Sequence, residues 1–214
     1  MDSRTHLVWD WNGTLLDDLT LVVSSTNSAF AAVGGRSVDT DEHRRVFRRP
    51  VAEFYAEILE RAVDAEEFGR LDRIFHDAYR LGLTSTSLAA DAKDAIKSWP
   101  GSQSLLSMWF HDELVPALDT YGLTGLFTRV DGLRTEVGGD LKAGHLARHL
   151  DELEVAGDRA VLIGDSLDDA AAAASIGAAC VLYTGGFTEP ARLRASGVPV
   201  ADSLVDAVAL AREL

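Results

Sequence analysis

Four residues of this chain combine types and positions that suit chemistry on a phosphate group. Asp10 and Asp165 each follow a short apolar stretch, "HLVW" and "AVLIG". Ser107 lies in another apolar stretch, and Lys142 precedes a segment of helical pattern. Two carboxylates can hold Mg²⁺ through hard oxygen ligands, and a carboxylate can attack phosphorus to form an aspartyl-phosphate. A hydroxyl, backbone N–H groups and a lysine can bind the non-bridging phosphate oxygens.

Asn12 stands two positions after Asp10, where one common kind of site needs a second carboxylate. An amide does not titrate at physiological pH, so Asn12 cannot donate or accept a proton. General acid–base help typically contributes about 10²–10⁴-fold to a rate. The backbone carbonyl is unaffected by the change, and Asn-Gly favours a tight turn. Asn12 therefore adds no acid or base beside Asp10.

Five short apolar segments are predicted to form the strands that position these residues. They lie at 6–11, 102–109, 126–133, 159–166 and 178–186. The last four are separated by helix-length segments, a rhythm typical of a parallel sheet covered by helices on both faces. Ligands of such sheets bind outside the carboxyl ends of the strands. The pattern thus predicts a Rossmann-like, doubly wound α/β core whose strand ends bring the polar residues together.

Residues typical of helix ends predict several helix boundaries near the C-terminus. The segment 167–177 holds five alanines and stops at Gly177, a natural residue for a helix end. Thr188 is the expected N-cap of the next helix, with Pro190 in its first turn. Asp202 stands at the head of the last helical pattern.

The region from 17 to 84 differs because its pattern is helical throughout. The economical interpretation is a small helical domain inserted after the first strand. We predict an α/β core domain formed by residues 1–16 and 85–214, and an inserted domain formed by residues 17–84. Four arginines of the insert (Arg44, Arg45, Arg48 and Arg49) are either a solvated helix face or a source of one contact to the anionic tail of a substrate.

The bulk composition excludes several classes of partner. The 214 residues carry a net charge of −14, which disfavours binding to nucleic acid and to anionic membranes. The single cysteine, Cys180, precludes an intrachain disulfide and fits a reducing compartment. No secretory signal and no apolar run of about 18 residues is visible. We expect a cytoplasmic protein with a small-molecule substrate, and the sequence leaves its oligomeric state open.

The motifs "DWNGTL", Ser107, Lys142 and "GDSLDD", in this order, resemble the four motifs of the haloacid dehalogenase-like (HAD) hydrolase superfamily. The similarity is greatest to the phosphoglycolate phosphatase and β-phosphoglucomutase-like branch, in which a helical cap domain lies between the first two motifs. The resemblance covers essentially the whole chain. It implies a Mg²⁺-dependent phosphatase that acts on a small phosphorylated metabolite.

The resemblance also implies roles for individual residues. Asp10 matches the nucleophile and a metal ligand, and Asn12 occupies the acid/base position with its carbonyl as a second metal ligand. Asp165 and Asp169 complete the implied metal site, and Asp168 is an additional acid whose share of the work stays open. Ser107 and Lys142 match the phosphate-binding pair. The other expected phosphate or substrate contacts are Gly13, Thr14, Met108, Arg48 and Arg49.

Asn12 leaves four interpretations. The protein is a phosphatase that is slow or prefers good leaving groups, or it is a binding or regulatory protein that has lost turnover. A dehalogenase also lacks the second aspartate, but it needs no metal, and "GDSLDD" keeps an acidic metal site. A phosphonoacetaldehyde hydrolase needs a lysine in the cap. The only lysines of this chain are Lys93, Lys97 and Lys142, and none falls in the predicted cap.

Overall fold

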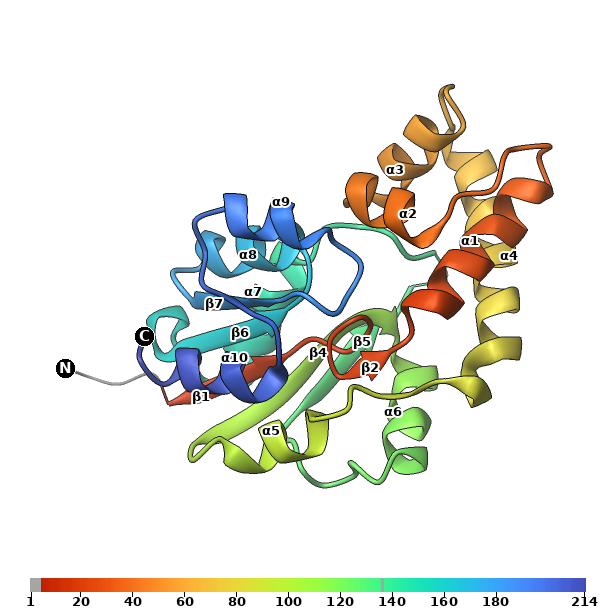
Figure 1. The fold of residues 1–214 in the computed structure, drawn as a ribbon. Coiled ribbons are helices and arrows are strands. Elements are labelled where there is room, and N and C mark those ends of the chain that lie inside the picture. The colour runs from red at the N-terminus through yellow and green to blue at the C-terminus, as the bar shows by residue number, and fades with distance from the viewer. Residues whose placement is uncertain (1–4, 136) are drawn as a thin grey trace.

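The computed structural model describes residues 5–135 and 137–214, and it has one principal sheet with helices on both faces (Figure 1). Within these residues the sheet has six strands in the order β5-β4-β1-β6-β7-β8. All neighbouring strands pair in parallel. The predicted Rossmann-like, doubly wound α/β fold is therefore confirmed.

The strands of this sheet are β1 (His6–Trp9), β4 (Ser102–Phe110), β5 (Val130–Leu133), β6 (Ala160–Gly164), β7 (Ala179–Tyr183) and β8 (Val200–Ala201). Four of the five predicted strands are shorter than the apolar segments that predicted them, whereas β4 extends one residue beyond its segment. The sequence analysis did not anticipate β8, because a strand of two residues has no periodicity to recognise. Strand β5 forms only the second half of the segment 126–133.

The centre of the sheet is buried on both faces, which explains its continuous apolar runs. Leu7 and Trp9 of β1 belong to one apolar cluster, and Val8 between them belongs to another. Side chains of a strand alternate between faces, so the two clusters lie on opposite sides of the sheet. Helices α7 and α8 contribute Leu146 and Ala172 to the cluster around Val8.

Six helices accompany the sheet: α5 (Ala92–Ser98), α6 (His111–Thr120), α7 (Ala143–Asp151), α8 (Leu167–Ser175), α9 (Pro190–Ala195) and α10 (Leu204–Ala211). Two short 3-10 helices, η1 (Leu83–Ser85) and η2 (Gly157–Arg159), also lie in the described parts of the chain. Gly177 follows the end of α8 and has a left-handed φ of 73°, so the helix ends where the sequence predicted.

Two predicted helix caps are wrong by one residue. The N-cap of α9 is Glu189 and not Thr188, because Pro190 takes the first helical position and the residue before a proline is held extended. The N-cap of α10 is Ser203 and not Asp202. The Ser203 hydroxyl accepts a hydrogen bond from the backbone N–H of Asp206, which is the usual N-cap geometry.

Four helices lie between Leu19 and Gly82, and we call them the helical segment: α1 (Leu19–Ala31), α2 (Thr40–Val46), α3 (Val51–Ile58) and α4 (Ala65–Gly82). They gather beside the sheet rather than on either of its faces (Figure 1). A small antiparallel sheet of β2 (Leu16–Asp17) and β3 (Ser87–Leu88) flanks them, which the sequence analysis did not anticipate. The division into a core domain and a cap domain stays a prediction.

None of the helices in the described parts of the chain is long and apolar enough to cross a membrane.

A buried chain of polar side chains crosses from β1 through β4 to α7. The Ser104 hydroxyl lies 2.7 Å from Nε2 of His6 and 2.7 Å from Nε2 of His149. The far nitrogen of His149 lies 2.7 Å from a carboxylate oxygen of Asp131. The sequence analysis places no function on His149, and the structure shows it as a buried, fully bonded core residue.

We predict that Ser104→Ala lowers the free energy of unfolding by about 2–4 kcal/mol, because two buried imidazoles each lose a hydrogen-bond partner. Ser102→Ala is the matched control, since Ser102 bonds the other nitrogen of His6 from an exposed position. Its cost is about 1 kcal/mol or less because water can replace the hydroxyl. Urea denaturation of both variants measures the difference, and equal losses would contradict the prediction.

Candidate active site

Three buried carboxylates meet at the carboxyl ends of the two central strands. Asp10 follows β1, Asp165 follows β6, and Asp169 lies in the first turn of α8. One ligand atom from each lies within 4.8 Å of the others. Strands β1 and β6 are adjacent and parallel, so their ends place Asp10 and Asp165 side by side. The structure thus brings together these three of the predicted metal ligands.

Lys142 inserts its ammonium group among these carboxylates. Its Nζ donates to Oδ1 of Asp10 at 2.6 Å and also contacts Oδ1 of Asp169. Burial alone lowers the pKa of a lysine, but the charges of the two aspartates outweigh it and hold the pKa of Lys142 above its ordinary value. Lys142 is therefore a fixed cation, and it binds carboxylates in this structure.

Asp168 and Asp169 make different contacts. Asp169 completes a capping box with Ser166, and its other oxygen contacts Lys142. Burial acts to raise the pKa of Asp169, but Lys142 and Ser166 hold it below its ordinary value. Asp168 accepts a hydrogen bond of 2.9 Å from the backbone N–H of Lys142. Asp169 thus caps a helix and pairs with the lysine, and Asp168 fixes the loop that carries the lysine.

Three carboxylates against one ammonium leave the cluster with excess negative charge. Burial, together with repulsion from Asp10 and Asp169, raises the pKa of Asp165 well above its ordinary value. Burial also raises the pKa of Asp10, against the opposing effect of Lys142. The partners of Asp165 are the backbone N–H of Phe187 at 2.6 Å and the Thr14 hydroxyl at 3.4 Å, both uncharged. An all-oxygen, negatively charged donor set of this kind fits a hard divalent cation such as Mg²⁺.

Two glycines allow the backbone to approach Asp165 closely. A Cβ atom at Gly13 would lie 2.7 Å from Oδ2 of Asp165, and the φ of Gly13 is +71°. A Cβ atom at Gly186 would lie 2.1 Å from the same oxygen. Both distances are below any normal contact, so glycine at positions 13 and 186 lets the backbone close around this carboxylate.

Asn12 is held in a hydrogen-bond network that joins the sheet to the helical segment. Its Nδ2 donates to Oδ2 of Asp18 at 2.9 Å and to the Tyr79 hydroxyl at 2.9 Å. Tyr79 of α4 donates to the same oxygen of Asp18 at 2.7 Å. The Ser107 hydroxyl donates to Oδ1 of Asn12 at 3.2 Å. Every polar atom of the Asn12 amide group therefore has a partner.

Asp18 is the acid of this network. It is buried, and its hydrogen-bond partners among the described residues are uncharged. It accepts from Asn12 and Tyr79, and from the backbone N–H of Gly13 at 2.8 Å. Burial raises its pKa to about 6, although these three hydrogen bonds favour the charged form. The amide at position 12 thus avoids placing a second carboxylate beside Asp18.

The remaining predicted contacts fall into two groups. Asn12, Met108, Lys142 and Arg49 line the small cavity over the carboxylates, whereas Ser107 is turned to Asn12 and the backbone N–H of Trp109. The Thr14 hydroxyl forms long contacts, of 3.4 Å each, to Asp10 and Asp165.

Arg48 is not brought to this cavity in the described chain. It pairs with Glu53 and Glu57 of α3 and is partly exposed. Its role as a substrate contact is therefore not supported, because its charge is neutralised by acids of its own helical segment. Arg49 is the arginine of the predicted pair that faces the cavity.

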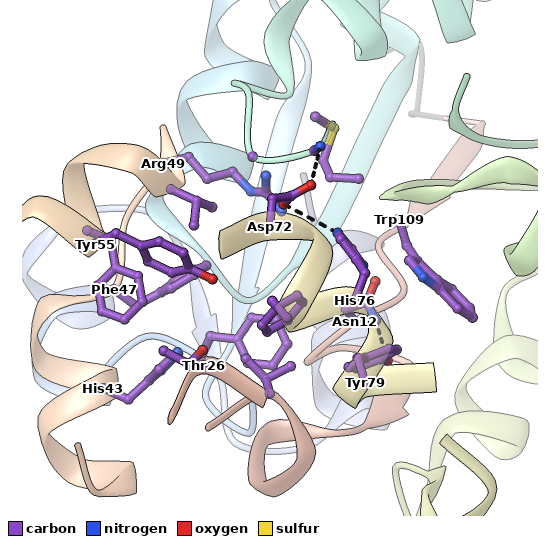
Figure 2. A pocket seen from close by; sticks show the side chains of 18 residues that line it. Asn12, Thr26, His43, Phe47, Arg49, Tyr55, Asp72, His76, Tyr79 and Trp109 are labelled. Atoms are coloured by element: carbon purple, nitrogen blue, oxygen red, sulfur yellow. Dashed lines mark hydrogen bonds and ion pairs between the residues drawn. The ribbon is translucent and has the colours of Figure 1, made fainter. Parts of the chain in front are cut away.

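A second, mostly aromatic cavity adjoins the first and lies between the helical segment and the sheet (Figure 2). We call it the aromatic chamber. Figure 2 shows His43, Phe47 and Tyr55 on one side and His76 and Trp109 on the other. The two cavities share five lining residues: Asn12, Phe47, Arg49, Met108 and Phe187. A molecule with one end at the carboxylates would therefore place its other end in the chamber.

The sequence analysis missed Asp18, Tyr79, His43 and Phe187 as parts of this region. Asp18 had a signal, because it follows Asp17 at the end of an apolar run, but sequence alone does not tell which of two neighbouring acids is buried. Asp17 is exposed and Asp18 is buried. The aromatic residues had none, since such residues in amphipathic helices normally indicate packing alone.

Comparisons with known proteins agree with this architecture. A family model described as HAD-hydrolase-like matches residues 137–207. No curated protein matches the chain in sequence. A predicted phosphatase from Clostridium acetobutylicum has a similar structure, with a TM-score of 0.87 at 16% identity over 99% of this chain and 100% of that one.

Two further solved structures are similar over nearly their whole length. A haloacid dehalogenase-like hydrolase from Streptococcus pneumoniae has a TM-score of 0.81 at 20% identity, covering 98% of this chain and 99% of that one. A predicted phosphoglycolate phosphatase from Haemophilus somnus has a TM-score of 0.76 at 19% identity, covering 98% of each chain. At these identities the likeness concerns the fold. The family match over residues 137–207 and the shared fold agree with the resemblance to HAD-like hydrolases that the motifs of this chain carry.

His43 generates a testable pH dependence. Burial, and then the charge of Arg44, lowers its pKa to about 4 from the ordinary 6.5. The unfolded chain binds this proton below about pH 6.5 and the folded chain does not. The stability contribution is therefore complete above that pH and declines toward pH 4.

We predict that the free energy of unfolding falls by about 2 kcal/mol more in the wild type than in His43→Phe when the pH is lowered from about 7.5 to about 5. Phenylalanine can keep the ring contacts of His43 with Phe47 and Phe54. His6, whose pKa is lowered similarly by burial, contributes equally to both proteins and cancels. Denaturant titrations at both pH values measure the difference, and parallel pH profiles would overturn the prediction.

Proposed function

We propose that this protein is a Mg²⁺-dependent phosphatase that hydrolyses small phosphate monoesters through an aspartyl-phosphate on Asp10. The observation that carries the proposal is the buried cluster of Asp10, Asp165 and Asp169 around the ammonium of Lys142. A cluster with excess negative charge cannot attract a phosphate by itself. With a divalent cation bound, the same groups become a site for an anion.

Asp10, Asp165 and the backbone carbonyl of Asn12 are the proposed ligands of the metal, with Asp169 as a supporting acid. When bound, Mg²⁺ would neutralise the repulsion between these carboxylates and the phosphate. Lys142 would contribute its ammonium to a phosphate oxygen while it orients Asp10. The Met108 backbone and Arg49, which line the same cavity, are the other proposed contacts.

In the first step the Asp10 carboxylate attacks phosphorus, and the bond from phosphorus to the leaving oxygen breaks. In the second step water attacks the same phosphorus and returns Asp10 to its carboxylate form. Asn12 lies where a proton donor would serve the leaving oxygen, and its amide supplies none. The proposed enzyme is therefore slow on alkyl esters and faster on esters whose leaving group is a weak base, since that group departs without a proton.

The net charge of the chain also bears on which partners it can bind. The net charge of −14 disfavours nucleic acid and anionic membrane surfaces, so the proposed partner is a small phosphorylated metabolite. The metal is what lets an acidic chain accept an anionic substrate.

We predict that the wild type hydrolyses p-nitrophenyl phosphate with Mg²⁺, stops when the metal is chelated, and recovers when Mg²⁺ is restored. Asp10→Asn should lower kcat/KM by about 10³-fold or more, because an amide cannot act as the nucleophile. Asp17→Asn is the matched control, since Asp17 is exposed on β2, and its rate should equal that of the wild type. Metal-independent turnover, or an active Asp10→Asn protein, would refute the proposal.

A second prediction concerns Asn12. Asn12→Asp should raise kcat on alkyl phosphates by about 10-fold or more by restoring a proton donor. It also places a carboxylate beside Asp18, so it should lose stability. The double variant Asn12→Asp/Asp18→Asn exchanges donor and acceptor, and it should keep the rate gain and recover the stability. Steady-state kinetics and urea denaturation test both parts. Unchanged rates in both variants would show that another group already supplies the proton.

A further inference from the structure

The aromatic chamber is built to surround an apolar group beside the carboxylates. Phe47 and Phe54 come from the helical segment, whereas Trp109 and Phe187 come from the loops and strands of the sheet. Phe47 and Phe187 line both cavities, and their rings lie 5.5 Å apart with an interplanar angle of 76°. Rings at such angles present both faces and edges, which suits contact with another ring.

Three polar side chains in the chamber lining, His43, His76 and Trp109, have buried atoms that lack hydrogen-bond partners within the described structure. Both ring nitrogens of His43 are buried and without a hydrogen bond, and the residue has 0% exposure. The indole N–H of Trp109, a residue with 3% exposure, is also unpaired. Buried polar groups normally have partners. Neighbouring side chains shield these atoms, so the lining offers a bound molecule mainly apolar surface.

The charged side chains of the chamber lining, Asp72 and Arg49, have opposite signs. Asp72 of α4 is buried in the lining, where it accepts from the backbone N–H of Gly138 at 3.2 Å and contacts His76 at 3.4 Å. Figure 2 shows Asp72 between the labelled Arg49 and His76. The lining therefore has no excess charge with which to hold an ionic tail, and its mostly aromatic surface suits an uncharged group.

We propose that the leaving group of the physiological ester is an uncharged aromatic alcohol, either a phenol or a hydroxylated heteroaromatic ring, held in the chamber. The inference rests on the proposed phosphatase function and names its substrate class. The chamber volume is about 90 Å³. An engineered cavity of about 150 Å³ takes up benzene, so this smaller chamber, which adjoins the cavity over the carboxylates, has room for at most one ring.

The reaction balances without a proton donor. As the Asp10 oxygen bonds to phosphorus, the aryl oxygen leaves with the electron pair of the broken bond, and the aryl oxide takes its proton from solvent. The pKa of a phenol is about 10, as for tyrosine, whereas that of water is about 15.7. An aryl oxide is therefore a much better leaving group than an alkoxide. Asn12 and the chamber thus point independently to the same class of ester.

The test compares five esters with the wild-type protein and Mg²⁺: acetyl, phenyl and benzyl phosphate, 2-phosphoglycolate and glycerol 1-phosphate. Acetyl phosphate needs neither a ring nor a proton donor, so it reports the phosphate site alone. We expect kcat/KM for phenyl phosphate to exceed that for the two aliphatic alcohol esters by at least about 10-fold. Benzyl phosphate should share the low KM of phenyl phosphate and have a low kcat, because its alkoxide is a poor leaving group.

Val22→Phe, which adds a ring to the chamber wall, should lower kcat/KM for phenyl phosphate at least about 10-fold more than for acetyl phosphate. Ser24→Phe on the exposed side of α1 is the matched control and should change neither. Preference for 2-phosphoglycolate, or equal effects of the two variants on phenyl phosphate, would overturn the inference and leave the phosphatase function standing. No turnover of any ester, acetyl phosphate included, would refute the phosphatase function itself.

Discussion

The contact of the Lys142 ammonium with Asp10 and Asp169 is the interaction on which the rest of the site depends. Moving an ion out of water costs several kcal/mol even after the protein relaxes. This site buries three carboxylates and one ammonium, so the lysine offsets part of that cost and leaves the rest. The fold accepts the remainder because backbone N–H groups and hydroxyls surround the carboxylates. A divalent cation would remove it, which is why the cluster is better suited to binding a metal than to stability.

The position of Lys142 depends on elements far apart in the sequence. Asp168 and Asp169 of α8 contact its backbone and its side chain, and Asp10 follows β1. Gly13 and Gly186 let two loops close on Asp165. The network of Asn12, Asp18 and Tyr79 then links this strand end to α4. A movement of α4 would therefore change the hydrogen bonds of Asn12.

Much of the fold could be predicted from sequence because its signals are local. Strand β6 is apolar throughout and alternates with helical segments, and Gly177 ends α8 as its type suggests. The errors are local too. Thr188 and Asp202 each stand one residue before the true cap, and β2, β3 and β8 have two residues each and no readable period.

The site was only partly predictable for a different reason. Asp10, Lys142 and Asp165 carry motif spacing, so their meeting could be expected. Arg48 and Arg49 are adjacent and alike in type, and only the structure shows that Arg49 lines the cavities while Arg48 pairs with glutamates. No sequence pattern shows that His43 and Trp109 line the chamber or that they have buried atoms without hydrogen-bond partners.

The central claim is that Asp10 carries the phosphoryl group during turnover, and the most direct measurement is acid-quenched mass spectrometry of the protein mixed with phenyl phosphate and Mg²⁺. The account predicts that one phosphoryl group is added to the protein, that it maps to the peptide containing Asp10, and that it disappears as substrate is exhausted. Turnover without a phosphorylated protein, or a phosphoryl group on another residue, would contradict the account.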